Sequence, residues 1–354
     1  MKITKFAAFL LTLVAAFTAL AVEPPLKVLI IDGQNNHDWK ATTPCMKGIL
    51  DTSGRFQTTV SNTPDKDAPQ TQWDTWRPKF QEYDCVLLNY NGQMWPEEVK
   101  KDFVDYVRNG GGVVLIHAAN NAFGGWKEYE QMAGLLWRWW TCGYSLYVDE
   151  NGKVNREEPG QGRMMGHGDW AGWYEWTMTV RDPEHPITRG MPQRWLHAKD
   201  ELYHGQRGPA ENLHILLTAY SQPGGKHNGT GKNEPIIWWT SFGKGRVVTT
   251  VMGHDVNAMK CAGFHLLLQR SCEWAATGHC TIPIPPNFPS AEKTTVDIHG
   301  ASVRGSAKAW QFTGDLLEDI MPRSTKLPDV AVNGSTMNLA LPPFSITVLS
   351  LGKH

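Results

Sequence analysis

Residues Gly110–Asn121 constrain the fold more than any other stretch of the chain. Three glycines precede the apolar run Val113–Ile116, and His117 follows directly. The run is too short for a core helix and too uniformly apolar for a strand with one face in water. It therefore predicts a strand buried on both faces, as in a parallel sheet covered by helices. Ligands of such sheets bind at the carboxyl ends of the strands, where His117 would lie.

Strands and helices alternate before this run. Strands are expected over residues 27–32 and 84–90, and helices from Thr42 or Thr43 to Thr52 and from Pro96 to about Asn109. Strand, helix and strand at this spacing indicate βαβ units. We therefore predict an α/β fold in which helices flank a parallel, flavodoxin-like sheet.

The chain changes character after His117. A tryptophan-rich helix is expected over 126–140, and the polar residues 147–165 predict a long surface excursion. Further strands are expected over 175–180, 213–219, 235–240 and 246–252, with a closing helix over 261–276.

The amino terminus has the pattern of a secretory signal peptide. A basic start precedes an uncharged stretch from Phe6 to Leu20 and an Ala-x-Ala site, which predicts cleavage after Ala21. A periplasmic or secreted location follows, with a mature chain of about 333 residues. No later segment predicts a membrane span, and a net charge of −1 without a basic block argues against nucleic acid as a partner.

The six cysteines leave the redox chemistry open. Export permits disulfides, and Cys272 and Cys280 are spaced for a local bridge. Cys85 and Cys261 lie in apolar runs and are expected to be buried thiols. No Cys-x-x-Cys pair occurs, which disfavours a zinc knuckle or a redox dithiol.

The carboxyl-terminal part differs from the rest. A proline-rich linker is expected over 282–295, between an α/β domain over 26–281 and a small β-rich domain over 296–354. Residues 341–351 resemble the last strands of the β-sandwich found at the carboxyl terminus of glycoside hydrolases.

Three histidines are expected at the carboxyl ends of strands of one sheet. His37 follows the first strand, His117 the central one, and His254 the strand over 246–252. Converging imidazoles suit zinc or another divalent metal, so these three are the predicted metal ligands. The alternative for each is a histidine that only orders its loop through backbone contacts.

A second polar group lies at residues 195–204, which include His197. Asp200, Glu201, Tyr203 and His204 are predicted to be catalytic together with His117, because carboxylates near histidines act as general bases or orient metal ligands. The alternative is a charged, solvated loop, against which the embedded aromatic residues argue. The predicted substrate-binding residues are Asn120, Trp126, His167 and Arg207.

Two kinds of chemistry are disfavoured. His117 occupies the position of a nucleophile elbow, and no Gly-x-Ser-x-Gly or Gly-x-Cys-x-Gly motif is present, so acyl-enzyme chemistry lacks its nucleophile. The spaced glycines of 160–166 precede no helix pattern, so no nucleotide cofactor is expected. Sixteen tryptophans either fill the core or offer one or two faces to sugar rings.

An ordered set of short motifs resembles the ThuA-like (trehalose-utilisation-like) family, relatives of the class I glutamine amidotransferase fold. The resemblance covers about Leu26 to Thr281 and depends on the blocks 37–39, 90–92, 110–121, 185–192, 200–203, 207–211, 243–246 and 253–254. It implies a flavodoxin-like sheet without the amidotransferase cysteine. It also implies a role in bacterial sugar utilisation, often beside oxidoreductases and 3-keto-sugar enzymes.

Two functional hypotheses follow. The first is an exported, metal-dependent enzyme, a hydrolase, lyase or isomerase, acting on a glycoside or a 3-keto-sugar. The second is a non-catalytic carbohydrate-binding or scaffold protein that has lost amidotransferase-type chemistry. A small-molecule carbohydrate is the expected partner in both. The sequence leaves open whether the chain forms a homo-oligomer.

Overall fold

The computed structural model describes residues 24–167, 174–224, 228–286 and 288–289, together with the backbone of strands between 295 and 350. The predicted signal peptide, residues 1–21, lies outside the described residues. Within the described part, no helix has the length and apolar character needed to cross a membrane.

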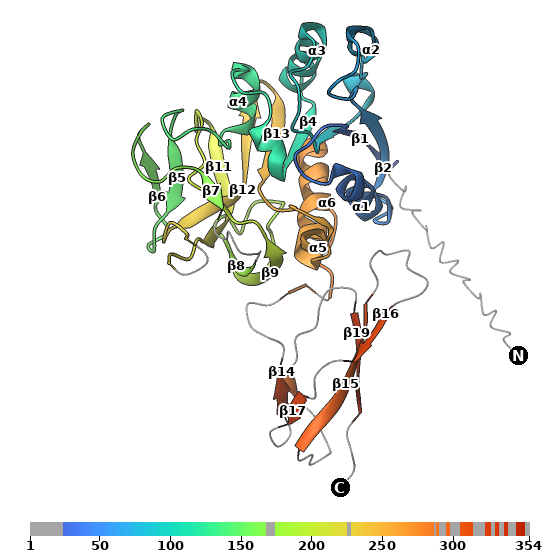
Figure 1. Cartoon of the computed structure of the whole chain (residues 1–354), viewed down its shortest axis with the longest axis vertical. Coiled ribbons are helices and arrows are strands. Elements are labelled where there is room, and N and C mark those ends of the chain that lie inside the picture. Colours follow the sequence, from blue (N-terminus) through green and yellow to red (C-terminus); the bar gives the residue numbers. More distant parts are fainter. Residues whose placement is uncertain are drawn as a thin grey trace, which may run out of the picture.

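The centre of the protein is an 11-stranded mixed sheet (Figure 1). Five neighbouring strands are parallel, in the order β2 (Phe56–Asn62), β1 (Leu26–Asp32), β3 (Cys85–Leu88), β4 (Gly112–Ile116) and β13 (Gly245–Thr250). Every residue of β3 and β4 is buried, as the apolar runs predict. The predicted parallel sheet is therefore confirmed for this half of the molecule.

Helices cover both faces of the parallel strands. Alternate residues of β1, β3 and β4 face α1 (Trp39–Asp51) and α6 (Ala262–Thr277) on one side. The others face α3 (Glu97–Arg108) and α4 (Lys127–Ala133) on the second side, where α2 (Gln70–Thr75) contributes Trp73. One apolar core therefore lies on each face of the sheet.

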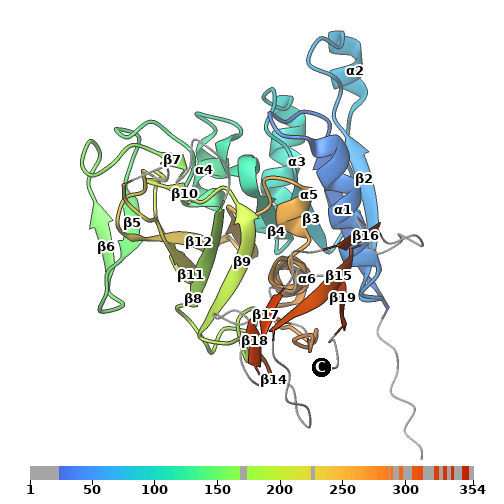
Figure 2. The ribbon, with the colours of Figure 1, turned by 60° about the horizontal axis from the view of Figure 1, so that its bottom comes forward.

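The other half of the sheet is antiparallel, which the sequence patterns do not predict. Beyond β13 the order is β12 (Asn233–Phe242), β11 (Leu213–Tyr220), β8 (Tyr174–Val180) and β9 (Arg194–Asp200). Figure 2 shows β8 and β9 side by side. Of the nine strands that follow one another from β2 to β9 across the sheet, β2 and β9 were not expected. The predicted parallel sheet is thus part of a larger, mixed one.

Two shorter antiparallel pairs follow, one joined to this half and one forming a separate two-stranded sheet. The predicted surface excursion over 147–165 contains part of a hairpin, β5 (Ser145–Val148) and β6 (Val154–Glu157). The pair β7 (Gly166–His167) and β10 (Tyr203–His204) is antiparallel and places His167 directly opposite Tyr203.

Helix boundaries differ from the expected ones where a cap was overlooked. Helix α1 begins at Trp39 because Asp38 caps it, its side chain accepting the N–H of Ala41, so Thr42 and Thr43 are not the caps. Helix α4 ends at Gly134, where the backbone has φ +74°, well before residue 140. Helix α6 ends at the left-handed Gly278, as predicted.

All six cysteines are free, so the Cys272–Cys280 bridge is corrected. Cys272 is fully buried on α6 and contacts Cys85 of β3, whereas the Cys280 thiol donates to the carbonyl of Arg270. The two sulfurs are thus held by different partners. Cys85 and Cys261 are buried, as expected.

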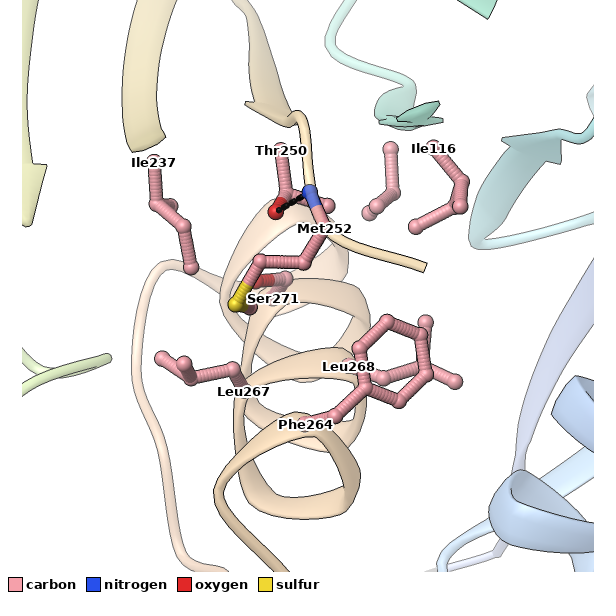
Figure 3. A pocket seen from close by; sticks show the side chains of 9 residues that line it. Ile116, Ile237, Thr250, Met252, Phe264, Leu267, Leu268 and Ser271 are labelled. Atoms are coloured by element: carbon pink, nitrogen blue, oxygen red, sulfur yellow. Dashed lines mark hydrogen bonds between the residues drawn. The ribbon is translucent and has the colours of Figure 1, made fainter. Parts of the chain in front are cut away.

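A small apolar pocket lies between α6 and strands β4, β12 and β13 (Figure 3). Its lining is apolar apart from Thr250 and Ser271, so it belongs to the packing of the core.

The described part of the carboxyl-terminal region consists of antiparallel strand pairs. The strands are β14 (Thr295–Asp297), β15 (Gly305–Thr313), β16 (Arg323–Lys326), β17 (Val330–Val332), β18 (Thr336–Asn338) and β19 (Ser345–Ser350). Strand β15 pairs with β16, β17 and β19, and β14 pairs with β18.

Candidate metal centre

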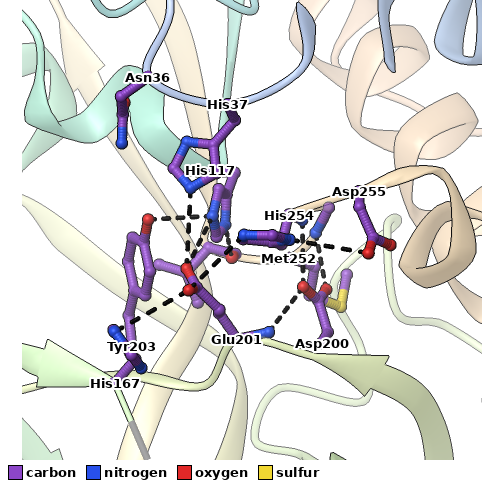
Figure 4. A network of polar contacts seen from close by, with 12 residues as sticks. Asn36, His37, His117, His167, Asp200, Glu201, Tyr203, Met252, His254 and Asp255 are labelled. Carbon is purple, nitrogen blue, oxygen red and sulfur yellow. Dashed lines mark hydrogen bonds and ion pairs between the residues drawn. The ribbon is translucent and has the colours of Figure 1, made fainter. Parts of the chain in front are cut away.

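Three histidines converge at the carboxyl edge of the parallel strands (Figure 4). His37 lies in the loop after β1, His117 starts the 3-10 helix η2 (His117–Asn121) after β4, and His254 follows β13. The ring centroids of His37 and His117 are 4.6 Å apart, and that of His254 lies 4.7 Å from His37 and 5.4 Å from His117. The sequence reasoning placed these side chains together, and the structure does so as well.

The carboxylate of Glu201 lies between the imidazoles. It enters from the turn between β9 and β10. The Nε2 atoms of His117 and His37 lie 3.3 and 3.8 Å from Oε2, and those of His254 and His167 lie 3.6 and 3.9 Å from Oε1. Separations of about 3–4 Å are those of atoms that share one metal ion with bonds of ~2.1 Å. Glu201 and the imidazoles are therefore close enough to bind one ion together.

The other ring nitrogen of three of these histidines faces an oxygen atom. Nδ1 of His117 lies 2.6 Å from the carbonyl oxygen of Val251, and Nδ1 of His37 lies 3.3 Å from Oδ1 of Asn35. Nδ1 of His254 faces Oδ2 of Asp255 at 3.8 Å. Because a carbonyl oxygen only accepts, Nδ1 of His117 carries the hydrogen and its Nε2 keeps a lone pair when the ring is neutral. Metal-binding histidines commonly have such second partners.

One subset of the cluster has the spacing of a ligand set. Among the residues that the structure describes, His37, Glu201 and His254 each offer an atom within 4.8 Å of the other two. His117 is not in this group, although its Nε2 lies 3.3 Å from Oε2 of Glu201, and the same atom accepts the hydroxyl of Tyr203 at 3.0 Å. The geometry thus groups Glu201, and not His117, with the other two predicted metal ligands.

His117 has a backbone conformation that is unusual for its residue type. Its φ is +49°, in the left-handed region, although it is not a glycine. Such a conformation costs about 1–2 kcal/mol for a residue with a Cβ and is found most often at functional sites. The sharp turn from β4 into η2 is the shape of a nucleophile elbow, with an imidazole in place of a cysteine or serine.

Asp200 fixes the surroundings of the cluster without facing it. Its carboxylate is fully buried and accepts the backbone N–H groups of Glu201, Gly253 and His254 at 2.7–3.1 Å. His197 contacts it from the other side, with Nε2 2.9 Å from Oδ2. One carboxylate thus ties the Glu201 turn to the His254 loop.

The charges within the cluster are strongly coupled. Burial would raise the pKa of Glu201, but the adjacent imidazoles of His117 and His37 lower it well below its usual value. Burial lowers the pKa of His37. Burial acts in the same direction on His254, but its contacts with Asp255 and Glu201 outweigh it and raise the pKa. The shifts of Glu201 and His37 favour the ionised carboxylate and the neutral imidazole in which such groups bind a metal, whereas the shift of His254 favours its protonated ring.

Four of the predicted site residues lie apart from the cluster. Trp126 is 6% exposed and packs among Phe123, Tyr129 and Trp95 in the core under α4, so it offers no face to a ligand there. His204 is buried and contacts Ser221.

The other two, Arg207 and Asn120, are buried and form hydrogen bonds with neighbouring loops. Arg207 is fully buried and donates to the backbone carbonyls of Glu158, Gln161 and Arg163. The side chain of Asn120 is buried against Gln206. Both therefore support loops and are not positioned at the imidazoles.

The sequence reasoning did not identify the partners that orient the cluster. Asn35 and Asp255 are each within two residues of a histidine and carry a carbonyl or carboxylate oxygen, which was the available signal. His197 belongs to the polar group over 195–204, but no role could be assigned to it because β9 was not expected.

Comparison with known proteins agrees with this fold. The family model ThuA, described as trehalose utilisation, matches residues 27–275. A ThuA-like protein from Parabacteroides merdae ATCC 43184 has 39% sequence identity and a TM-score of 0.70, covering 76% of this chain and 96% of that one. Another, from Bacteroides uniformis ATCC 8492, has 19% identity and a TM-score of 0.48, covering 73% and 95%. Comparison with curated proteins gives no match.

The matched residues contain the whole histidine cluster and Glu201. The ordered motifs, the sheet with its elbow at His117 and the family match all agree. The chain belongs to the ThuA family, described as trehalose utilisation, and has a glutamine amidotransferase-like α/β fold with a histidine at the nucleophile position.

Proposed function

We propose that this protein is an exported, metal-dependent enzyme that acts on a glycoside or a 3-keto-sugar. One observation carries the proposal: the Nε2 atoms of His37 and His254 face the two oxygens of Glu201 at ligand spacing. Two imidazoles and one carboxylate form the ligand set of catalytic zinc and iron sites, in which further positions stay open for substrate. The carbohydrate class is supported by the family's description as trehalose utilisation.

The donor set fits a divalent metal such as zinc. His37 and His254 would bind through Nε2, because their Nδ1 atoms face Asn35 and Asp255. Glu201 would add a negative charge that offsets part of the charge of the ion. Such an ion polarises a carbonyl or hydroxyl oxygen of the substrate as a Lewis acid.

His117 and Tyr203 would move the proton. Nδ1 of His117 is held by the carbonyl of Val251, so Nε2 is the atom that exchanges a proton. The hydroxyl of Tyr203 lies 3.0 Å from it. A neutral imidazole can take a proton from a sugar hydroxyl, or from a carbon next to a ketone, and return it at another position. Hydrolysis, elimination and isomerisation all use such a step.

The proposal is tested by following native and 3-keto glycosides with the purified protein. Turnover is expected with at least one of them, and it should stop on chelation and return when zinc is added back. Tight binding without turnover, with or without added metal, would instead favour a non-catalytic carbohydrate-binding protein. Export is tested separately, because amino-terminal sequencing of the mature protein should begin at Val22.

A further inference from the structure

The indole of Trp137 lies beside the metal centre and has no part in the chemistry proposed above. It is partly buried, and its ring centroid lies 4.6 Å from that of Tyr203 in an edge-on contact. The ring of His167 lies 6.2 Å away and is inclined by only 29°. Tyr203 and His167 are opposite each other in the β7–β10 pair, so Trp137 meets two side chains of one small ribbon.

Two short series of side-chain contacts connect Trp137 with Glu201. Through Tyr203 the series continues to Nε2 of His117, which lies 3.3 Å from the carboxylate. Through His167 the series is shorter, because Nε2 of that ring lies 3.9 Å from Oε1 of Glu201. One side chain, His167, or two, Tyr203 and His117, thus lie between the indole and the carboxylate of Glu201.

The backbone around Trp137 is held on both sides. Leu136 and Arg207 exchange two backbone hydrogen bonds of 2.8 and 2.9 Å, and the N–H of Trp137 donates to the carbonyl of Asn120 at 3.4 Å. Arg138 adds side-chain bonds to the carbonyls of Asn121 and Ala122. The buried Arg207 and Asn120 thus support the segment that carries the indole.

Rigid placement of a large flat side chain is a property of binding sites. An aromatic ring held before ligand arrives loses little conformational entropy on binding. The groups nearest to it are an imidazole, a phenol hydroxyl and a carboxylate, all able to bond hydroxyl groups. A ring with an apolar C–H face and a hydroxylated edge matches both features, and a pyranose has that character.

We propose that Trp137 is a stacking subsite for a pyranose ring next to the metal centre. This inference deepens the proposed function, because a sugar on Trp137 would direct its neighbouring glycosidic or carbonyl group toward Glu201. Trp139 provides the matched comparison: it is two residues away and 54% exposed.

The test is calorimetric titration of chelator-treated protein with trehalose, cellobiose and methyl β-glucoside. The wild type is expected to bind at least one of them. Trp137→Ala and Trp137→Leu should weaken this binding by about tenfold or more, Trp137→Phe should retain most of it, and Trp139→Ala should match the wild type. Leucine keeps apolar bulk without a flat face, so it separates stacking from folding.

Two results would overturn the subsite. One is a wild type that binds none of the three sugars. The other is a folded Trp137→Leu protein that binds them as well as the wild type does. Because the titration uses metal-free protein, it is independent of the metal assignment. Sugar binding lost in the Trp137 variants of a protein that never holds metal would leave the subsite intact and remove the enzyme proposal.

Discussion

The carboxylate of Asp200 accepts the backbone N–H of His254 at 3.1 Å, across 54 residues of sequence. The same side chain accepts the N–H of Glu201, the next residue along the chain. Two members of the proposed metal-ligand group, His254 and Glu201, come from opposite halves of the sheet and are therefore positioned by one buried carboxylate. Asp200 acts on the cluster through the backbone and is a positioning residue.

Asp200→Asn should weaken metal binding while leaving the ligands in place. An amide offers one acceptor oxygen where the carboxylate offers two, so at least one of the N–H groups of Gly253, His254 and Glu201 loses its partner. Loss of a group that orients metal ligands typically costs about 10–100-fold in affinity. Competition with a fluorescent zinc chelator measures this. Asp149→Asn is the control, since Asp149 also accepts backbone N–H groups, in a surface turn. Equal zinc affinity in both variants would remove the positioning role.

Tyr203→Phe should slow turnover and leave the metal content unchanged. The variant keeps the aromatic ring that packs on Trp137 and removes only the hydroxyl 3.0 Å from His117. A positioned proton donor contributes about 10²–10⁴-fold to a rate. Initial rates with the substrate found above provide the measurement. Tyr106→Phe is the matched control, because the Tyr106 hydroxyl is buried against the carbonyl of Gly112. A Tyr203→Phe rate equal to that of the control would exclude the hydroxyl from the proton step.

The stability of the fold should fall as pH rises through the range in which Glu234 ionises. Burial raises the pKa of this carboxyl from 4.5 to about 7, although bonds with Thr230 and Gly205 oppose the rise. Between these values the folded state keeps a proton that the unfolded state has released. The free energy of unfolding therefore decreases with pH, by up to about 1.4 kcal/mol per unit.

Glu234→Gln should abolish this part of the pH dependence. Urea unfolding of the variant and the wild type at pH 5 and pH 7.5 gives the comparison, and Glu211→Gln, at an exposed position, is the control. A wild type and a Glu234→Gln variant with the same pH slope would show that Glu234 is ionised throughout.

The parallel half of the fold could be predicted because its strands are continuous apolar runs. Val113–Ile116 and its neighbours are buried on both faces, which leaves a strong sequence signal. Strand β2 lies at the edge of the sheet and carries five polar or hydroxyl side chains besides Phe56 and Val60, so its pattern is weak. In β9 the buried residues include His197 and Asp200, which in sequence are typical of a solvated loop.

The residues of the candidate site could likewise be predicted only where the local sequence carries a signal. The three histidines could be placed together, because each follows a strand of one parallel sheet. Glu201 could be recognised as chemically suited, but its position among them depends on β9, which was not expected. The burial of Trp126 and Arg207 likewise follows from long-range packing that no local pattern reports.

Elemental analysis of the purified protein tests the central claim most directly. The wild type is expected to hold one equivalent of a divalent metal. His37→Ala, His254→Ala and Glu201→Gln should each lose most of it, since each removes one of the three grouped ligands. His279→Ala, which changes an exposed histidine, should retain it. Metal content that is the same in the wild type and all four variants, or absent from every one after reconstitution with zinc, would contradict the account.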